Sequence, residues 1–138
     1  MEQLKSKPLV CAALVLCVLL VVGSLTFAGP CVHDDGSAAA CHAAAHAVTA
    51  AGCVGAVAAL MALFVRSRAA SGVLSLVCAA SGLFAAICPG TLFGLCMMQT
   101  MRCWTVMKPF ALVCGVIVCA LGVIAAIMLF KKQGRAAQ

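Results

Sequence analysis

The apolar residues of this chain fall into four long runs, and the polar residues collect in the segments between them. The runs cover approximately residues 9–28, 38–65, 69–88 and 109–130. A bilayer core of about 30 Å is crossed by roughly 20 apolar residues in a helix, which pairs its own backbone groups inside lipid. None of the runs alternates strictly, as a barrel strand would. The pattern therefore predicts an all-α membrane protein with four transmembrane helices in a single domain, residues 1–138.

Composition and charge exclude other classes of protein. The chain is 66% hydrophobic and 9% charged, whereas a soluble domain has about 45–50% apolar and about 25% charged residues. It is also too apolar to be disordered. The first run has the basic start of a signal peptide, but it is longer than the roughly 7–15 apolar residues of a signal core. We therefore interpret it as a true span.

The basic residues indicate how the spans are oriented. Two fall in the loop 89–108, Arg102 and Lys108, and seven fall on the opposite side of the predicted membrane: Lys5, Lys7, Arg66, Arg68, Lys131, Lys132 and Arg135. Because cytoplasmic segments carry the excess of Lys and Arg, both termini are predicted to be cytoplasmic. The loops 29–37 and 89–108 are then the outer loops. This distribution leaves no basic patch for nucleic acid, and the spans contain no charged residue that would indicate an ion pathway.

Small residues recur every three or four positions in three of the spans. Such spacing places them on one helix face, where they let helix backbones approach closely in lipid. The faces comprise Ala47, Ala51, Gly55 and Ala59; Gly72, Ser75, Ala79, Gly82 and Ala86; and Ala111, Gly115, Cys119, Gly122 and Ala126. They predict a compact four-helix bundle, with a homo-oligomer interface as the alternative use.

The eleven cysteines divide into two groups. Six lie within the spans, where we expect them to act as small apolar side chains: Cys11, Cys17, Cys53, Cys78, Cys114 and Cys119. Cys88 ends the third span. The remaining four, Cys31, Cys41, Cys96 and Cys103, belong to the outer face, where an oxidising environment favours disulfides. Four cysteines allow three pairings, and the sequence does not choose among them.

Two alternatives use the same outer residues. One is a soft-metal or haem site, because thiolate, thioether and imidazole ligands favour Cu(I), and histidine with methionine can hold haem iron. Its candidate ligands are Cys41, His42, His46, Met101, His33 and Met97. The other is a membrane thiol–disulfide oxidoreductase, although the chain has no C-x-x-C motif and its nearest outer spacing is Cys96 to Cys103.

The second outer loop has recognisable boundaries. Pro89 and Gly90 predict the end of the third span, and Pro109 suits the first turn of the fourth. Between them, residues 91–98 are apolar but too short to cross the membrane. We expect a short interfacial or re-entrant segment there, with Trp104 at the level of the headgroups.

The outer motifs resemble those of a family of small prokaryotic membrane proteins grouped as domain of unknown function 4418. The matching positions are Pro30–Cys31, Cys41–His42, Pro89, Gly94, Cys96, Met101, Cys103 and Pro109. This chain has Ala40 and Ala43 where the family often has Met and an aromatic residue around Cys-His. The resemblance implies four spans, an outer cysteine cap and a location in a prokaryotic cell membrane. It also implies an association with ABC-type export permeases.

The sequence contains no phosphate-binding glycine loop and no nucleophile elbow. We therefore expect a non-catalytic accessory or interaction subunit with a disulfide-stapled outer cap and no required cofactor. Its expected partners are the lipid bilayer and a membrane protein or a second copy of the chain. The copper or haem site and the thiol oxidoreductase remain the alternatives.

Overall fold

The fold consists of four long helices, and the computed structural model describes residues 3–26, 39–92 and 103–138. The helices are α1 (Gln3–Leu25), α2 (Ala39–Phe64), α3 (Arg68–Ile87) and α4 (Lys108–Ala136). Each is long and apolar enough to cross a membrane, and the described residues contain no strand. Within the described residues, the prediction of an all-helical chain with four helices long and apolar enough to span a membrane is confirmed.

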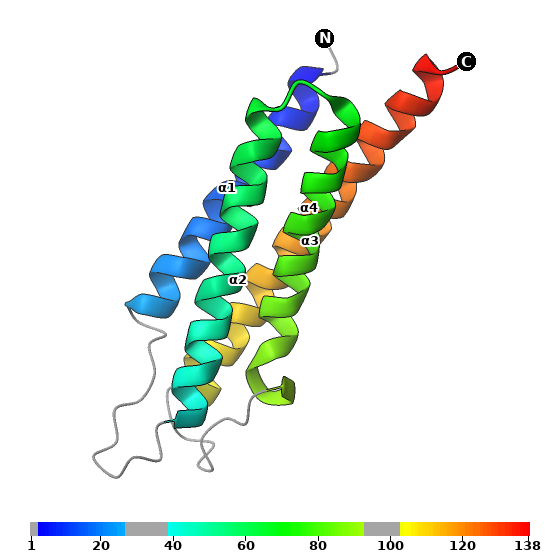
Figure 1. The fold of residues 1–138 in the computed structure, drawn as a ribbon. Helices are drawn as coiled ribbons and strands as arrows, with labels where there is room; N and C mark the ends of the chain where they lie inside the picture. The colour runs from blue at the N-terminus through cyan, green and yellow to red at the C-terminus, as the bar shows by residue number, and fades with distance from the viewer. Residues whose placement is uncertain (1–2, 27–38, 93–102) are drawn as a thin grey trace.

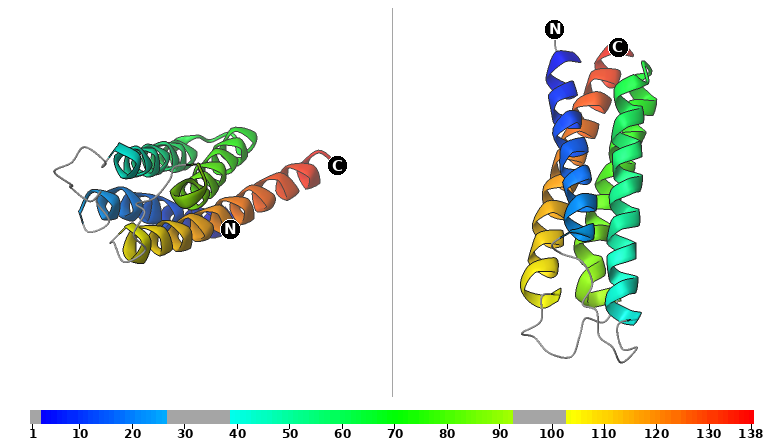
Figure 2. Two further views of the ribbon diagram at one scale, coloured as in Figure 1. Left: turned by 90° about the horizontal axis from the view of Figure 1, so that it is seen from below. Right: turned by 90° about the vertical axis from the view of Figure 1, so that its left-hand side faces the viewer.

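The helices run side by side with alternating directions (Figure 1). Contacts join α1 to α2, α2 to α3, α3 to α4 and α4 back to α1, whereas α1 and α3 touch only slightly. Both views in Figure 2 are consistent with this four-membered ring of neighbours. The contact between α3 and α4 is the most extensive. As a result, α1 and α3 lie diagonally opposite each other.

The two ends of the four-helix arrangement contain different segments of the chain. The terminal end holds the start of α1, the short α2–α3 turn at residues 65–67 and the end of α4 (Figure 1). The loop end holds the end of α1, the start of α2, the end of α3 and the start of α4. The segments that carry the seven basic residues therefore come together at the terminal end.

The helix bounds differ from the apolar runs mainly at the terminal end. α1 begins at Gln3 and includes Pro8, and α4 continues beyond Phe130 to Ala136. Lys, Gln, Arg and Ala all favour helix, so the helical backbone continues past the point where the apolar run stops. Hydropathy marks the part of a helix that suits lipid, and the helix itself is longer.

The turns that were expected at the outer loop are present. α3 ends at Ile87, and Pro89 and Gly90 leave the helical conformation within Cys88–Leu92. Gly90 has a φ of 94°, in the left-handed region that glycine adopts without steric cost. Pro109 lies in the first turn of α4, where its missing N–H leaves no hydrogen bond unmade.

Small residues form the contacts between helices, as their spacing predicted. A Cβ placed on Gly82 would lie 2.9 Å from the carbonyl oxygen of Gly115, and one on Gly122 would lie 2.9 Å from that of Ser75. Backbone therefore meets backbone along the contact of α3 and α4, which we call the glycine seam. Many large aliphatic side chains instead face outward, among them Val15, Leu19, Val57, Val73, Leu112 and Ile127. Such a surface suits the hydrocarbon of a bilayer.

Hydroxyl groups make the polar contacts between the helices. The Oγ of Ser24 on α1 and the Oγ1 of Thr49 on α2 are 2.9 Å apart. The Oγ of Ser71 on α3 donates to the carbonyl oxygen of Ala62 on α2 at 3.2 Å. Among the described residues, no buried side-chain nitrogen or oxygen lacks a hydrogen-bond partner. The interior therefore meets the requirement that polar groups inside lipid be paired.

Candidate functional site

Most of the predicted outer site belongs to the segments between the helices. Cys31, His33, Cys96, Met97 and Met101 lie outside the described residues. The structure places the backbone of Cys41 in the first turns of α2, and that of Cys103 in the short π-helical turn Cys103–Met107, but it does not describe their side chains. The disulfide cap and its pairing stay predictions.

His42 and His46 are the two candidate ligands whose side chains are described. They lie four residues apart on one face of α2, at the loop end, with ring centroids separated by 6.3 Å and ring planes inclined by 29°. His42 is partly buried and His46 is exposed. Among the described side chains, no group of three or more His, Cys, Asp or Glu residues could hold a metal ion. A metal held here would need further ligands from the outer loops or from solvent.

Four other side chains are described at the loop end: those of Trp104, Lys108, Cys88 and Met107. The Nζ of Lys108 lies 4.3 Å from the centroid of the Trp104 ring, a cation–π arrangement that holds the ammonium over the aromatic face. Cys88 is a free thiol and is fully buried. Met107 is also buried, at 1% exposure. Trp104 and Lys108 thus form a polar–aromatic pair at the start of α4, where an interfacial tryptophan was expected.

The six cysteines of the spans are all free thiols, as their assignment to apolar positions implied. Two of them meet across the centre of the molecule. The Sγ atoms of Cys17 on α1 and Cys78 on α3 are 4.0 Å apart, and the two residues are 1% and 2% exposed. The pair joins the diagonal helices, which otherwise scarcely touch. Sequence reasoning did not find this pair, because nothing in one sequence indicates that positions 61 apart will face each other.

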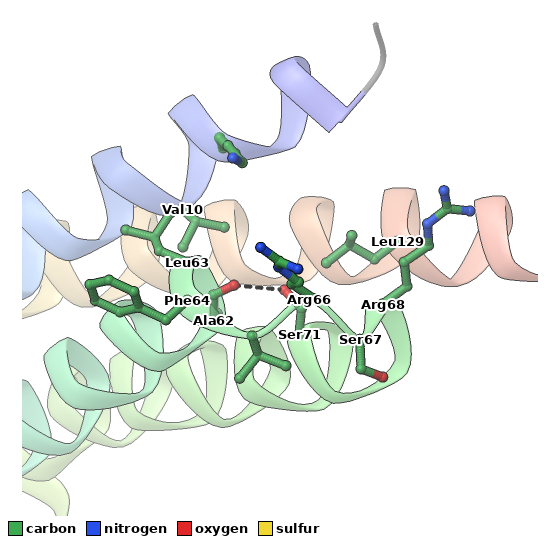
Figure 3. A pocket seen from close by; sticks show the side chains of 11 residues that line it. Val10, Ala62, Leu63, Phe64, Arg66, Ser67, Arg68, Ser71 and Leu129 are labelled. Carbon is green, nitrogen blue, oxygen red and sulfur yellow. Dashed lines mark hydrogen bonds between the residues drawn. The ribbon is translucent and has the colours of Figure 1, made fainter.

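A cavity of about 470 Å³ lies at the terminal end, between α1, the α2–α3 turn with the start of α3, and α4. Lys7, Arg66 and Arg68 line it together with apolar residues such as Val10, Leu63 and Leu129. Figure 3 shows the side chains of Arg66, in the turn, and Arg68, at the start of α3. The sequence placed these basic residues on one side of the membrane, but it gave no sign of a cavity among them.

Comparison with known proteins gives one match. A sequence model described as domain of unknown function (DUF4418) matches residues 13–129. No curated protein and no solved structure matches the chain. The matched segment contains all of α2 and α3 and most of α1 and α4.

Proposed function

The chain belongs to the DUF4418 family, and from its structure we propose that it is a non-catalytic accessory subunit. In this proposal it lies in the cell membrane of a prokaryote and contacts a membrane-protein partner through its loop end. An ABC-type export permease is the class of partner that the family resemblance implies. The proposal rests on how the side chains are distributed between the loop end and the membrane-spanning middle.

The observation that carries the proposal is the contrast between the middle of the helices and the loop end. In the middle, small residues make contacts between the helices of this chain, and the outward surface is aliphatic. The imidazoles of His42 and His46 and the Trp104–Lys108 pair lie at the loop end, next to both predicted outer loops. Histidine and tryptophan side chains offer polar and aromatic contacts to a protein, which the aliphatic surface does not.

We further propose that the loop end faces the outside and the terminal end faces the cytoplasm. The structure supports this because the segments with seven of the nine basic residues lie at one end, and such residues are retained in the cytoplasm. On the oxidising side, disulfides among Cys31, Cys41, Cys96 and Cys103 would staple the outer loops over the helices. The four helices would then form a compact bundle beneath this cap.

Site-specific photocrosslinking in intact cells tests the accessory role. A benzophenone amino acid replaces either His46, at the loop end, or Val57, which is exposed on the same helix at lipid depth. We expect position 46 to crosslink to one membrane protein, and position 57 to give no protein adduct. Adducts to the same protein from position 57 alone, or no adduct from position 46, would contradict a partner at the loop end.

A second candidate function is binding of copper, or of haem, at the same end. The observation that favours it is the His42–His46 pair on one helix face, since histidines at positions i and i+4 can bind one metal ion. Replacing both by alanine is expected to weaken Cu(I) binding by more than about 10-fold, the smallest effect usual for losing even an outer-shell partner. The control is Cys53→Ser on the lipid-facing side of α2. Equal affinity in all three proteins, or purified protein without affinity for copper or haem, would remove this candidate.

A further inference from the structure

The cavity at the terminal end has features of a ligand site that the proposed function does not use. It lies between α1, the α2–α3 turn and α4 and has a volume of about 470 Å³ (Figure 3). Three cationic side chains, those of Lys7, Arg66 and Arg68, contribute to its lining. We propose that this cavity binds the phosphate group of an anionic phospholipid, whose acyl chains lie along its apolar wall.

Charge complementarity is the first argument. The chain has three acidic residues, Glu2, Asp34 and Asp35, and among the described residues that line the cavity there are three cations and no carboxylate. Asp34 and Asp35 belong to the connection at the loop end. Cations that share a cavity repel one another, so an anion among them is stabilising. Arginine also matches phosphate well, because its planar guanidinium donates two parallel hydrogen bonds.

The arrangement of polar and apolar residues with depth is the second argument. On α1, Val10 lies about one helical turn deeper in the membrane than Lys7, and on α2 Leu63 lies about one turn deeper than Arg66. Leu129 on α4 completes the apolar lining. A free phosphate ion would use only the basic rim, whereas a phospholipid uses both the rim and the apolar wall. Basic pockets between membrane helices are known sites for anionic headgroups.

Native mass spectrometry of the purified full-length protein in detergent tests the proposal, with phosphatidylglycerol as the probe and phosphatidylcholine as the zwitterionic comparison. The variant Arg66→Gln with Arg68→Gln is expected to bind phosphatidylglycerol about 30-fold more weakly. This corresponds to about 1 kcal/mol for each arginine–phosphate hydrogen bond lost, at about 1.4 kcal/mol per tenfold. Binding of phosphatidylcholine should not change. The variant Lys7→Gln, on α1, should also bind phosphatidylglycerol more weakly, but with a smaller loss than the double arginine variant.

The matched control removes the same charge at the same end but outside the cavity, as Lys131→Gln with Lys132→Gln. We expect it to keep its affinity for phosphatidylglycerol within about threefold, because only a general surface attraction is reduced. Equal losses in the two double variants, or no loss in either, would overturn the site. Inorganic phosphate forms the last arm. If inorganic phosphate displaces the bound lipid as effectively as added phosphatidylglycerol does, the cavity is a site for free phosphate and the lipid assignment is wrong.

Folding of the variants is checked by thermal unfolding. Arg66 is exposed and Arg68 partly exposed, so the double variant should unfold at the same temperature as the wild type in phosphatidylcholine micelles. Phosphatidylglycerol should raise the unfolding temperature of the wild type and of the Lys131–Lys132 variant only. A similar rise in the Arg66–Arg68 variant would contradict the proposal even if its lipid adducts were weak.

Discussion

The glycine seam and the terminal end use the same two helices, α3 and α4, in different ways. In the seam, Gly82 and Gly115 bring backbone against backbone. Nearer the terminal end, a Cβ on Gly72 would meet the ring of Phe130 at 3.0 Å, so a side chain rather than a backbone faces the glycine there. The residue before Phe130, Leu129, lines the cavity. The size of the facing side chains thus decides whether α3 and α4 pack closely or stand apart.

The largest expected effect comes from adding one methyl group to the glycine seam. In Gly115→Ala the new Cβ would lie 2.9 Å from the backbone nitrogen of Ala86, and that backbone cannot move without shifting α3. We expect the free energy of unfolding to fall by about 1–3 kcal/mol, the usual cost of overpacking. Unfolding in mixed micelles, followed by circular dichroism, measures the change.

The matched control is Gly134→Ala near the end of α4, where nothing lies within 4 Å of the new Cβ. This variant should gain about 0.5–1 kcal/mol, because alanine favours helix over glycine. The two substitutions are chemically identical, so opposite signs would isolate the close approach of the backbones. A loss of stability at both positions, or a gain at both, would show that the close approach of the backbones does not decide the effect of the added methyl group.

How far the sequence predicts this fold depends on whether a feature is periodic or tertiary. The apolar runs predict four helices, and spacings of three and four predict the buried faces that include Ser75, Gly82 and Gly115. Pro89 and Gly90 predict the end of α3 from their own backbone preferences. By contrast, the cavity and the contact of Cys17 with Cys78 depend on how each helix is rotated against its neighbours. No local signal contains that information.

The candidate site likewise has features that the local sequence predicts and features that depend on the tertiary fold. The side of the membrane on which the basic residues lie can be predicted from their positions in the sequence, because a charge count per loop suffices. The cavity formed by Lys7, Arg66 and Arg68 requires the start of α1 and the α2–α3 turn to lie together, which only the fold shows. At the loop end, the i, i+4 spacing of His42 and His46 is enough to place them on one face of a helix, and their rings do lie close together on α2.

A moderate effect is expected where a hydroxyl pair joins α1 to α2. A double-mutant cycle of Ser24→Ala and Thr49→Val should give a coupling energy of about 0.6 kcal/mol, the mean for hydrogen bonds between membrane helices. Thr26→Val serves as the control, because among the described residues the Oγ1 of Thr26 donates within its own helix, to the carbonyl oxygen of Val22. Its coupling to Thr49→Val should be near zero. A Ser24–Thr49 coupling no larger than this control would show that the hydroxyl pair adds nothing between the helices.

The smallest change to the fold is expected from linking the diagonal helices. In a chain that keeps only Cys17 and Cys78, a membrane-permeant oxidant such as iodine should join the two sulfurs within one chain, with loss of both thiol protons. Their 4.0 Å separation needs little movement to form the bond. Mass spectrometry of the intact protein detects the loss of two hydrogens. A chain that keeps Cys17 and Cys53 should not react in this way, since Cys53 is exposed on α2. Linkage of the Cys17–Cys53 chain alone would contradict the diagonal placement of α1 and α3.

The central claim is that the loop end faces outward and the terminal end faces the cytoplasm, since the disulfide cap and the contact with a partner both depend on it. Labelling with a membrane-impermeant maleimide in intact cells tests it most directly, in a chain whose own cysteines are replaced by alanine. One variant carries Gly36→Cys in the first outer loop, and the other carries Ser67→Cys in the exposed α2–α3 turn. The account predicts labelling of the first in intact cells and of the second only after the membrane is opened. Labelling of Ser67→Cys in intact cells, with Gly36→Cys protected, would contradict it.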